Sequence, residues 1–185
     1  MRPLLLLVLA AILPLRAADP VFERASNKLD RIESGHSRPG SVIIFTPAEL
    51  NAWAKKRVPE MYEGVRDPSL QLSVGTATGS ALIDFLKMRQ AEGLATNSLI
   101  AKLIDGERPL KVSIRLESGG GRATAHLTRL EISGIAVTGA ALDFLVNQFL
   151  LPLFRDAKIN QPFDLRDNME RIELRPDGVR ITMRK

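Results

Sequence analysis

The residues able to do metal chemistry are few and scattered in this sequence. Its two histidines are His36, in a stretch rich in turn-forming residues, and His126, on the polar side of an alternating segment. No His-x-x-x-His pair and no cysteine is present, so the ligand spacing of a zinc site is missing. We therefore expect neither a metal site nor a cofactor.

Nucleophiles and phosphate-binding loops are equally hard to find. Ser80 and Ser133 stand beside glycines, but neither lies in a Gly-x-Ser-x-Gly motif. The glycine-rich stretches 75–79 and 119–121 lack the lysine and the following helix of a phosphate loop. These patterns favour turns and close backbone contacts rather than catalysis.

Three carboxylates flank apolar runs and invite comparison with acid/base pairs. Asp84, Asp143 and Asp164 have no second carboxylate at a fixed spacing, so capping or helix-surface roles are favoured. An enzyme site assembled from distant carboxylates stays open, and Asp84 and Glu131 are then the first residues to test. We expect a protein that is not an enzyme.

The N-terminus predicts export. Arg2 supplies a positive charge, residues 4–12 form an unbroken apolar run, and small residues follow at Ala17 and Ala18. This order is typical of a signal peptide, and the run is shorter than the ~20 residues that a membrane-spanning helix needs. We predict cleavage near Ala17 and a secreted or periplasmic, soluble protein.

Charge argues against nucleic acid as a partner. Loss of residues 1–17 removes Arg2 and Arg16 and no acid, which lowers the net charge from +5 to +3. Acids and bases alternate along residues 164–175, so no stripe of one sign forms for phosphate binding. The expected organisation is a signal peptide at 1–17, an N-terminal helix and loop at 18–40, and one domain at 41–185.

Hydrophobic periodicity predicts an α+β protein. Helical spacing marks residues 21–32, 46–59 and 97–104, and the second of these opens with a Thr46 to Glu49 capping box. The apolar run at residues 42–45 predicts a buried strand. Alternation predicts strands or hairpins at residues 70–74, 77–85, 110–117 with 123–132, and 172–175 with 179–183. Because the alternation changes phase along 123–132, we predict a bulge near Thr128 and Arg129.

The strongest helical pattern covers residues 142–153 and carries a wide apolar stripe. A stripe packed on a sheet is ordinarily part of a core. The functional alternative is a curved antiparallel sheet wrapped around this helix, which leaves a groove for an apolar ligand. Candidate groove residues are Val112, Ile114, Leu142, Leu145, Val146, Phe149, Leu150 and Leu153.

The order of these parts resembles the bacterial tubular lipid-binding (TULIP-like) families, and the LmeA-type phospholipid-binding domain looks nearest. The similarity lies in the strand 42–45 that runs into Thr46-Pro47-Ala48-Glu49-Leu50-Asn51, in residues 130–135 that lead to the apolar helix, and in the closing hairpin 172–183. The short, glycine-interrupted stretch 87–94 departs from that layout.

The resemblance implies an exported protein that binds a phospholipid, a fatty acid or another apolar ligand, with peripheral membrane contact as a further expectation. The alternative is a cell-envelope assembly or scaffold protein that docks a partner on its apolar helix.

Overall fold

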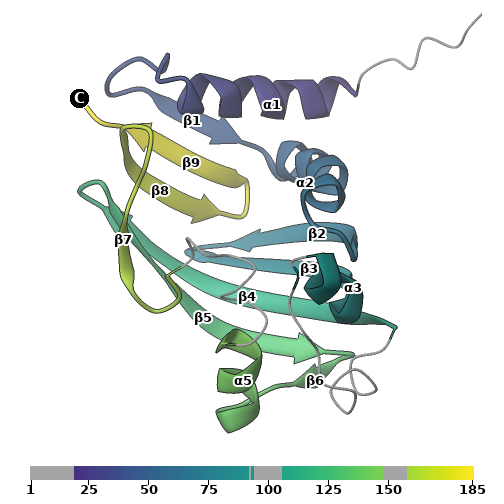
Figure 1. Ribbon diagram of the computed structural model, residues 1–185. Helices are drawn as coiled ribbons and strands as arrows, with labels where there is room; N and C mark the ends of the chain where they lie inside the picture. Colours follow the sequence, from purple (N-terminus) through teal and green to yellow (C-terminus); the bar gives the residue numbers. More distant parts are fainter. Residues whose placement is uncertain (1–18, 92, 94–105, 148–157) are drawn as a thin grey trace, which may run out of the picture.

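The computed structural model describes residues 19–91, 93, 106–147 and 158–185 of the chain (Figure 1). Helices and strands follow one another in a mixed order that is typical of an α+β fold. In chain order they are α1 (Pro20–Glu33), β1 (Val42–Phe45), α2 (Pro47–Met61), β2 (Val65–Ser73), β3 (Thr76–Asp84), α3 (Phe85–Ala91), β4 (Glu107–Gly119), β5 (Arg122–Ile132), β6 (Ile135–Ala136), α5 (Gly139–Leu145), β7 (Pro162–Asp164), β8 (Met169–Arg175) and β9 (Gly178–Met183).

The strands form two sheets, whereas the sequence suggested one curved sheet. The three-stranded sheet has the order β1-β9-β8, and the six-stranded sheet has the order β2-β3-β4-β5-β6 with β7 on the side of β5. The pairings between these strands are antiparallel, which confirms the predicted α+β class with antiparallel strands.

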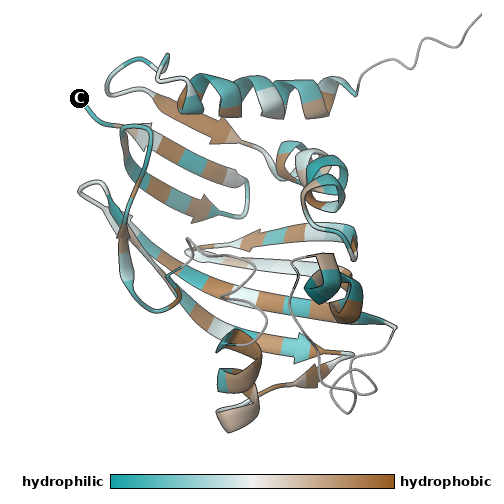
Figure 2. Ribbon diagram, in the orientation of Figure 1, coloured by the Kyte–Doolittle hydropathy of each residue, from teal (hydrophilic) through white to brown (hydrophobic). Residues whose placement is uncertain are grey.

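The central hairpin of the six-stranded sheet is formed by β4 and β5. Ser113 pairs with Arg129 but the next residue, Ile114, pairs with Leu127, so Thr128 is the extra residue of a bulge. The Thr128 hydroxyl donates to the Ser113 carbonyl over 3.0 Å. The predicted bulge is thus confirmed, and Figure 2 shows the alternating hydropathy of both strands on either side of it.

Helix α1 covers one face of the three-stranded sheet (Figure 1). Asp19 is the N-cap of this helix, and its side chain accepts a hydrogen bond from the Val21 amide over 2.9 Å. Its apolar stripe then packs on the side chains that alternate toward it from β1 and β9. The cluster contains Ile32, Ile43, Phe45, Ile181 and Met183, with Leu29, Leu50, Met169, Ile172 and Val179 against it.

Helix α2 begins with the predicted capping box. The Glu49 amide donates to the Thr46 hydroxyl over 3.2 Å, and the Thr46 amide donates to the Glu49 carboxylate over 2.9 Å. The predicted end at Pro59 is too early, because the helix continues to Met61. Pro59 lies in the last turns of the helix and removes only the backbone hydrogen bond to the carbonyl of Lys55. Lys55 is exposed, so water can bind that carbonyl.

The Glu49 carboxylate also ties α2 to α1 and β1. It is only 3% exposed, and Lys28 Nζ lies 2.7 Å from each of its oxygens while donating to the Ile44 carbonyl, also over 2.7 Å. Burial alone would raise the pKa of Glu49. Hydrogen bonds from Lys28 and Thr46, with the charge of Lys28, overcome that effect and hold the pKa below its ordinary value.

A second cluster lies at the end of the six-stranded sheet near α3. It contains Val65, Ile83, Phe85 and Met88, and Leu145 of α5 packs against it. Helix α3 begins as expected for a capped helix, because the Asp84 carboxylate accepts from the Lys87 amide over 3.0 Å.

Two predicted helices fall partly or wholly outside the described residues. Residues 97–104 lie outside them, and the pattern 142–153 is described only through residue 147, with α5 spanning Gly139–Leu145. Strand β2 begins at Val65, earlier than predicted, since a register shift between Arg66 and Ser69 interrupts the alternation that the sequence displays there.

The first testable prediction concerns Phe45, which is 1% exposed. Phe45→Ala should lower the free energy of unfolding by about 3–5 kcal/mol, because it removes a buried ring and leaves a cavity. Val42→Ala, on the same strand at 53% exposure, should cost less than about 1 kcal/mol. Urea denaturation followed by circular dichroism measures both, and equal losses would contradict the assigned core.

The second prediction concerns the stability of the fold at low pH. Because the folded-state pKa of Glu49 is lowered, its carboxylate stabilises the fold above the unfolded pKa of about 4.3, and this contribution is lost as pH falls through the folded value. Glu49→Gln should lower stability at pH 7 by roughly 1–3 kcal/mol and flatten the acid dependence of unfolding.

Glu60→Gln is the matched control on the same helix, because Glu60 is half exposed in its pair with Arg57. It should change stability by less than about 1 kcal/mol. An unaltered acid denaturation profile in Glu49→Gln would disprove the role assigned to this carboxylate.

Candidate apolar binding site

The side chain of Asn51 fixes α2 beside the edge of the six-stranded sheet. Its amide nitrogen donates to the Leu70 carbonyl over 2.9 Å, and its carbonyl oxygen accepts from the Leu70 amide over 2.8 Å. The same nitrogen donates to the Pro47 carbonyl over 2.8 Å. Asn51 therefore pairs with the edge strand β2 as a neighbouring strand would, and it sets the distance between helix and sheet.

A groove of about 350 Å³ lies between α2 and the apolar face of the sheet. The helix contributes residues spaced i, i+3, i+4 and i+8, which share one face. The sheet contributes neighbouring positions of β2, β3 and β4. The lining consists of Leu50, Trp53, Ala54, Val58, Pro68, Ser69, Leu70, Gly79, Ser80, Ala81, Leu110 and Val112.

Gly79 leaves room in the middle of the sheet beneath this groove. It pairs with Leu70 on one side and with Val112 on the other, so both neighbours carry large side chains while Gly79 carries none. A Cβ atom built at Gly79 would meet no atom within 4 Å. A glycine within a strand often marks a place where a ligand or another chain approaches closely.

Polar groups around the groove are largely used within the protein. The hydroxyls of Ser69 and Ser80 lie 2.8 Å apart and bond to each other, and the Asn51 amide is occupied as described. Trp53 is the single tryptophan of the chain, and its indole N–H has no hydrogen-bond partner within the described residues. The groove can therefore hold hydrocarbon, with one donor available at its wall.

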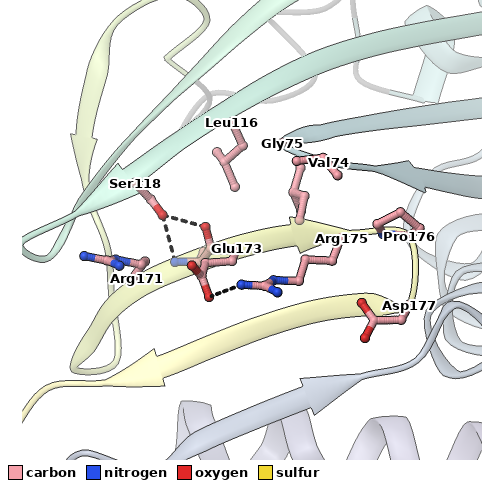
Figure 3. A pocket seen from close by; sticks show the side chains of 11 residues that line it. Val74, Gly75, Leu116, Ser118, Arg171, Glu173, Arg175, Pro176 and Asp177 are labelled. Atoms are coloured by element: carbon pink, nitrogen blue, oxygen red, sulfur yellow. Dashed lines mark hydrogen bonds and ion pairs between the residues drawn. The ribbon is translucent and has the colours of Figure 1, made fainter.

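A larger cavity, of about 580 Å³, lies where β8 meets the six-stranded sheet, and its lining is much more polar (Figure 3). Ser118 joins the two sheets there, since its hydroxyl donates to the Ile172 carbonyl over 2.6 Å and accepts from the Ile172 amide over 2.8 Å. Glu173 and Arg175 form an ion pair of 3.8 Å across its front. This cavity combines apolar and charged side chains, whereas the lining of the groove is almost entirely apolar.

The structure describes five of the eight residues expected to form the site. Val112 lines the groove, and Ile114 follows it on the same face of β4, half-buried. Leu145 packs against the second core cluster, while Leu142 and Val146 are half-buried nearby in sequence. Phe149, Leu150 and Leu153 lie outside the described residues.

The helical wall of the groove was missed by sequence reasoning. The signal was available in the spacing of Leu50, Trp53, Ala54 and Val58, which gives one apolar face on α2. That face is narrow and interrupted by charged residues. The wider apolar stripe at 142–153 was therefore predicted to line the groove instead.

The candidate catalytic residues occupy structural positions. Ser133 lies in the turn after β5 with a φ of 52°, and Asp164 is 90% exposed opposite Arg122. Glu131 pairs with Lys111 and Arg129 on the polar face of the sheet. Within the part of the chain that the structure describes, no group of three or more histidine or acidic side chains is close enough to bind a metal ion.

No helix among the described residues is long and apolar enough to cross a membrane. Comparisons of the chain with protein-family models, with curated proteins and with solved structures find no match. The geometry of the groove is therefore the observation that bears on function.

The third prediction uses Gly79. Gly79→Leu should place its side chain in the open groove without a clash and raise the free energy of unfolding by roughly 0.5–1 kcal/mol, because glycine weakens a strand interior. The emission of Trp53 should shift to shorter wavelengths as water leaves the groove.

Gln71→Leu is the control, since Gln71 is exposed, follows the groove-lining Leu70 on β2 and is absent from the groove lining. It should leave the tryptophan emission unchanged. Marked destabilisation of Gly79→Leu in thermal unfolding would mean that the groove is already filled.

Proposed function

We propose that this chain is an exported protein that binds a phospholipid, a fatty acid or another apolar ligand in the groove between α2 and β2–β4. The observation that carries the proposal is a groove of about 350 Å³ with an apolar lining and a glycine at its centre. Its volume falls at the lower end of the ~300–1,000 Å³ typical of small-molecule sites.

The energetics of such binding need no catalytic motif. Each methylene transferred from water into the groove contributes about 0.8 kcal/mol, so the hydrocarbon alone can supply most of the affinity. The hydroxyls of Ser69 and Ser80 at the border are already paired with each other, so a hydrocarbon chain lying over them breaks no hydrogen bond.

Export and family membership belong to the same proposal. The apolar run 4–12 behind Arg2 supports secretion or a periplasmic location after cleavage near Ala17. The antiparallel sheets and the helices on their apolar faces are compatible with a TULIP-like shell. In this chain α2 borders the groove, which makes it an element to examine for ligand contact.

A docking role remains the second candidate, and one observation favours it. Val42 and Ile44 of the edge strand β1 are 53% and 40% exposed, on the face opposite the α1 core. An apolar edge strand is a site for pairing with another chain. The two candidates predict different masses for the purified protein.

The fourth prediction is tested by native mass spectrometry of protein purified without detergent, and by titration with a brominated fatty acid. The bound lipid should add mass to a monomer, and the bromines should quench Trp53 because it lines the groove. Gly79→Leu should lower affinity at least about tenfold, or ~1.4 kcal/mol, and Gln71→Leu should not.

A uniformly ligand-free protein with no quenching would rule out the carrier proposal. Oligomers without lipid, dissociated by Ile44→Asp, would favour docking through β1 instead.

A further inference from the structure

The face of α2 that lines the groove also carries a cation, Arg57, between the lining residues Ala54 and Val58. Arg57 follows Trp53 by four residues and Ala54 by three, so it lies one turn farther along the face that lines the groove. Among the described residues that line the groove, none is acidic. The helix face that borders the groove therefore combines apolar side chains with one exposed positive charge.

The present partner of Arg57 can be exchanged. Arg57 Nη1 lies 3.0 Å from Glu60 Oε2, and the two side chains are 51% and 50% exposed. An exposed pair of this kind is worth at most about 1 kcal/mol, because water and salt screen it. A ligand anion with its alkyl chain anchored in the groove would compete with Glu60 at high local concentration.

Trp53 provides a second polar contact at the same place. Its indole N–H has no partner within the described residues, whereas the other polar side chains at the groove, Ser69, Ser80 and Asn51, are satisfied. A tryptophan whose ring borders an apolar site usually directs its N–H to a polar group at the boundary. One donor and one guanidinium thus lie on the same face of α2.

We infer that the ligand is a single-chain amphiphile with an anionic head, whose alkyl chain lies over Gly79 and whose carboxylate or phosphate binds Arg57 and the Trp53 indole N–H. This inference rests on the proposed function and adds the charge and the position of the head group. Arg57 would select among ligands of equal chain length, while the groove would set the overall affinity.

The test compares hexadecanoic acid, hexadecyl phosphate and hexadecanol by isothermal titration calorimetry at low and high salt, with inorganic phosphate as the ligand without a chain. Both anions should bind the wild-type chain about five- to tenfold more tightly than the alcohol, and this preference should shrink as salt rises. Inorganic phosphate should show no binding.

Arg57→Gln should reduce affinity for both anions to the level of the alcohol and leave alcohol binding unchanged. Trp53→Phe should weaken anion binding by a smaller factor. Lys55→Gln is the matched control, because Lys55 lies on α2 two residues away and is absent from the groove lining. Thermal unfolding should be the same in Arg57→Gln and Lys55→Gln.

The outcomes distinguish failure of the head-group assignment from failure of the proposed function. Equal binding of acid and alcohol by the wild-type chain, or equal losses in Arg57→Gln and Lys55→Gln, would overturn the head-group assignment and leave the groove intact. Absence of binding for every long-chain ligand would refute the proposed function, and the head-group assignment with it. Binding of inorganic phosphate alone would place an anion site at Arg57 without a role for the groove, which overturns both.

Discussion

The position of α2 depends on hydrogen bonds from two nearby side chains, Glu49 and Asn51, which point to different neighbours. Glu49 faces α1 and β1, where Lys28 and the Thr46 amide satisfy its buried charge, and Asn51 faces the edge of β2, where it pairs with Leu70. Both sets of hydrogen bonds are directional, so they fix the helix at a set distance where apolar contacts alone would draw it closer. The space left between helix and sheet is the candidate site.

The same geometry explains why the groove remains apolar. Strand alternation brings Leu70, Ala81 and Val112 to the face beneath α2, while hydroxyls such as those of Thr78 and Ser113 bond to one another. Gly79 is the exception in this pattern, because it lies on the apolar face and contributes no side chain. A core without ligand would be expected to fill that position.

Polar contacts join the two sheets, and neither apolar cluster among the described residues includes strands of both sheets. Ser118 bonds twice to Ile172, and the Gly75 and Gly121 amides donate to the carbonyls of Leu174 and Glu170. The apolar clusters lie on either side of this junction, one under α1 and one near α3.

The sequence by itself determined the features that depend on neighbours within a few residues. The Thr46 to Glu49 capping box, the hairpins and the Thr128 bulge follow from local hydrogen bonds and from the two-residue period of a strand, and all were predicted correctly. Only the tertiary structure showed that α2 borders open space. Asn51 meets Leu70 across 19 residues and Glu49 meets Lys28 across 21, and periodicity along the chain carries no information about such contacts. An apolar helix face has the same sequence pattern whether a neighbouring element packs directly on it or leaves a ligand-sized space beside it. The sequence pattern cannot distinguish the two cases, because burial depends on distances in space.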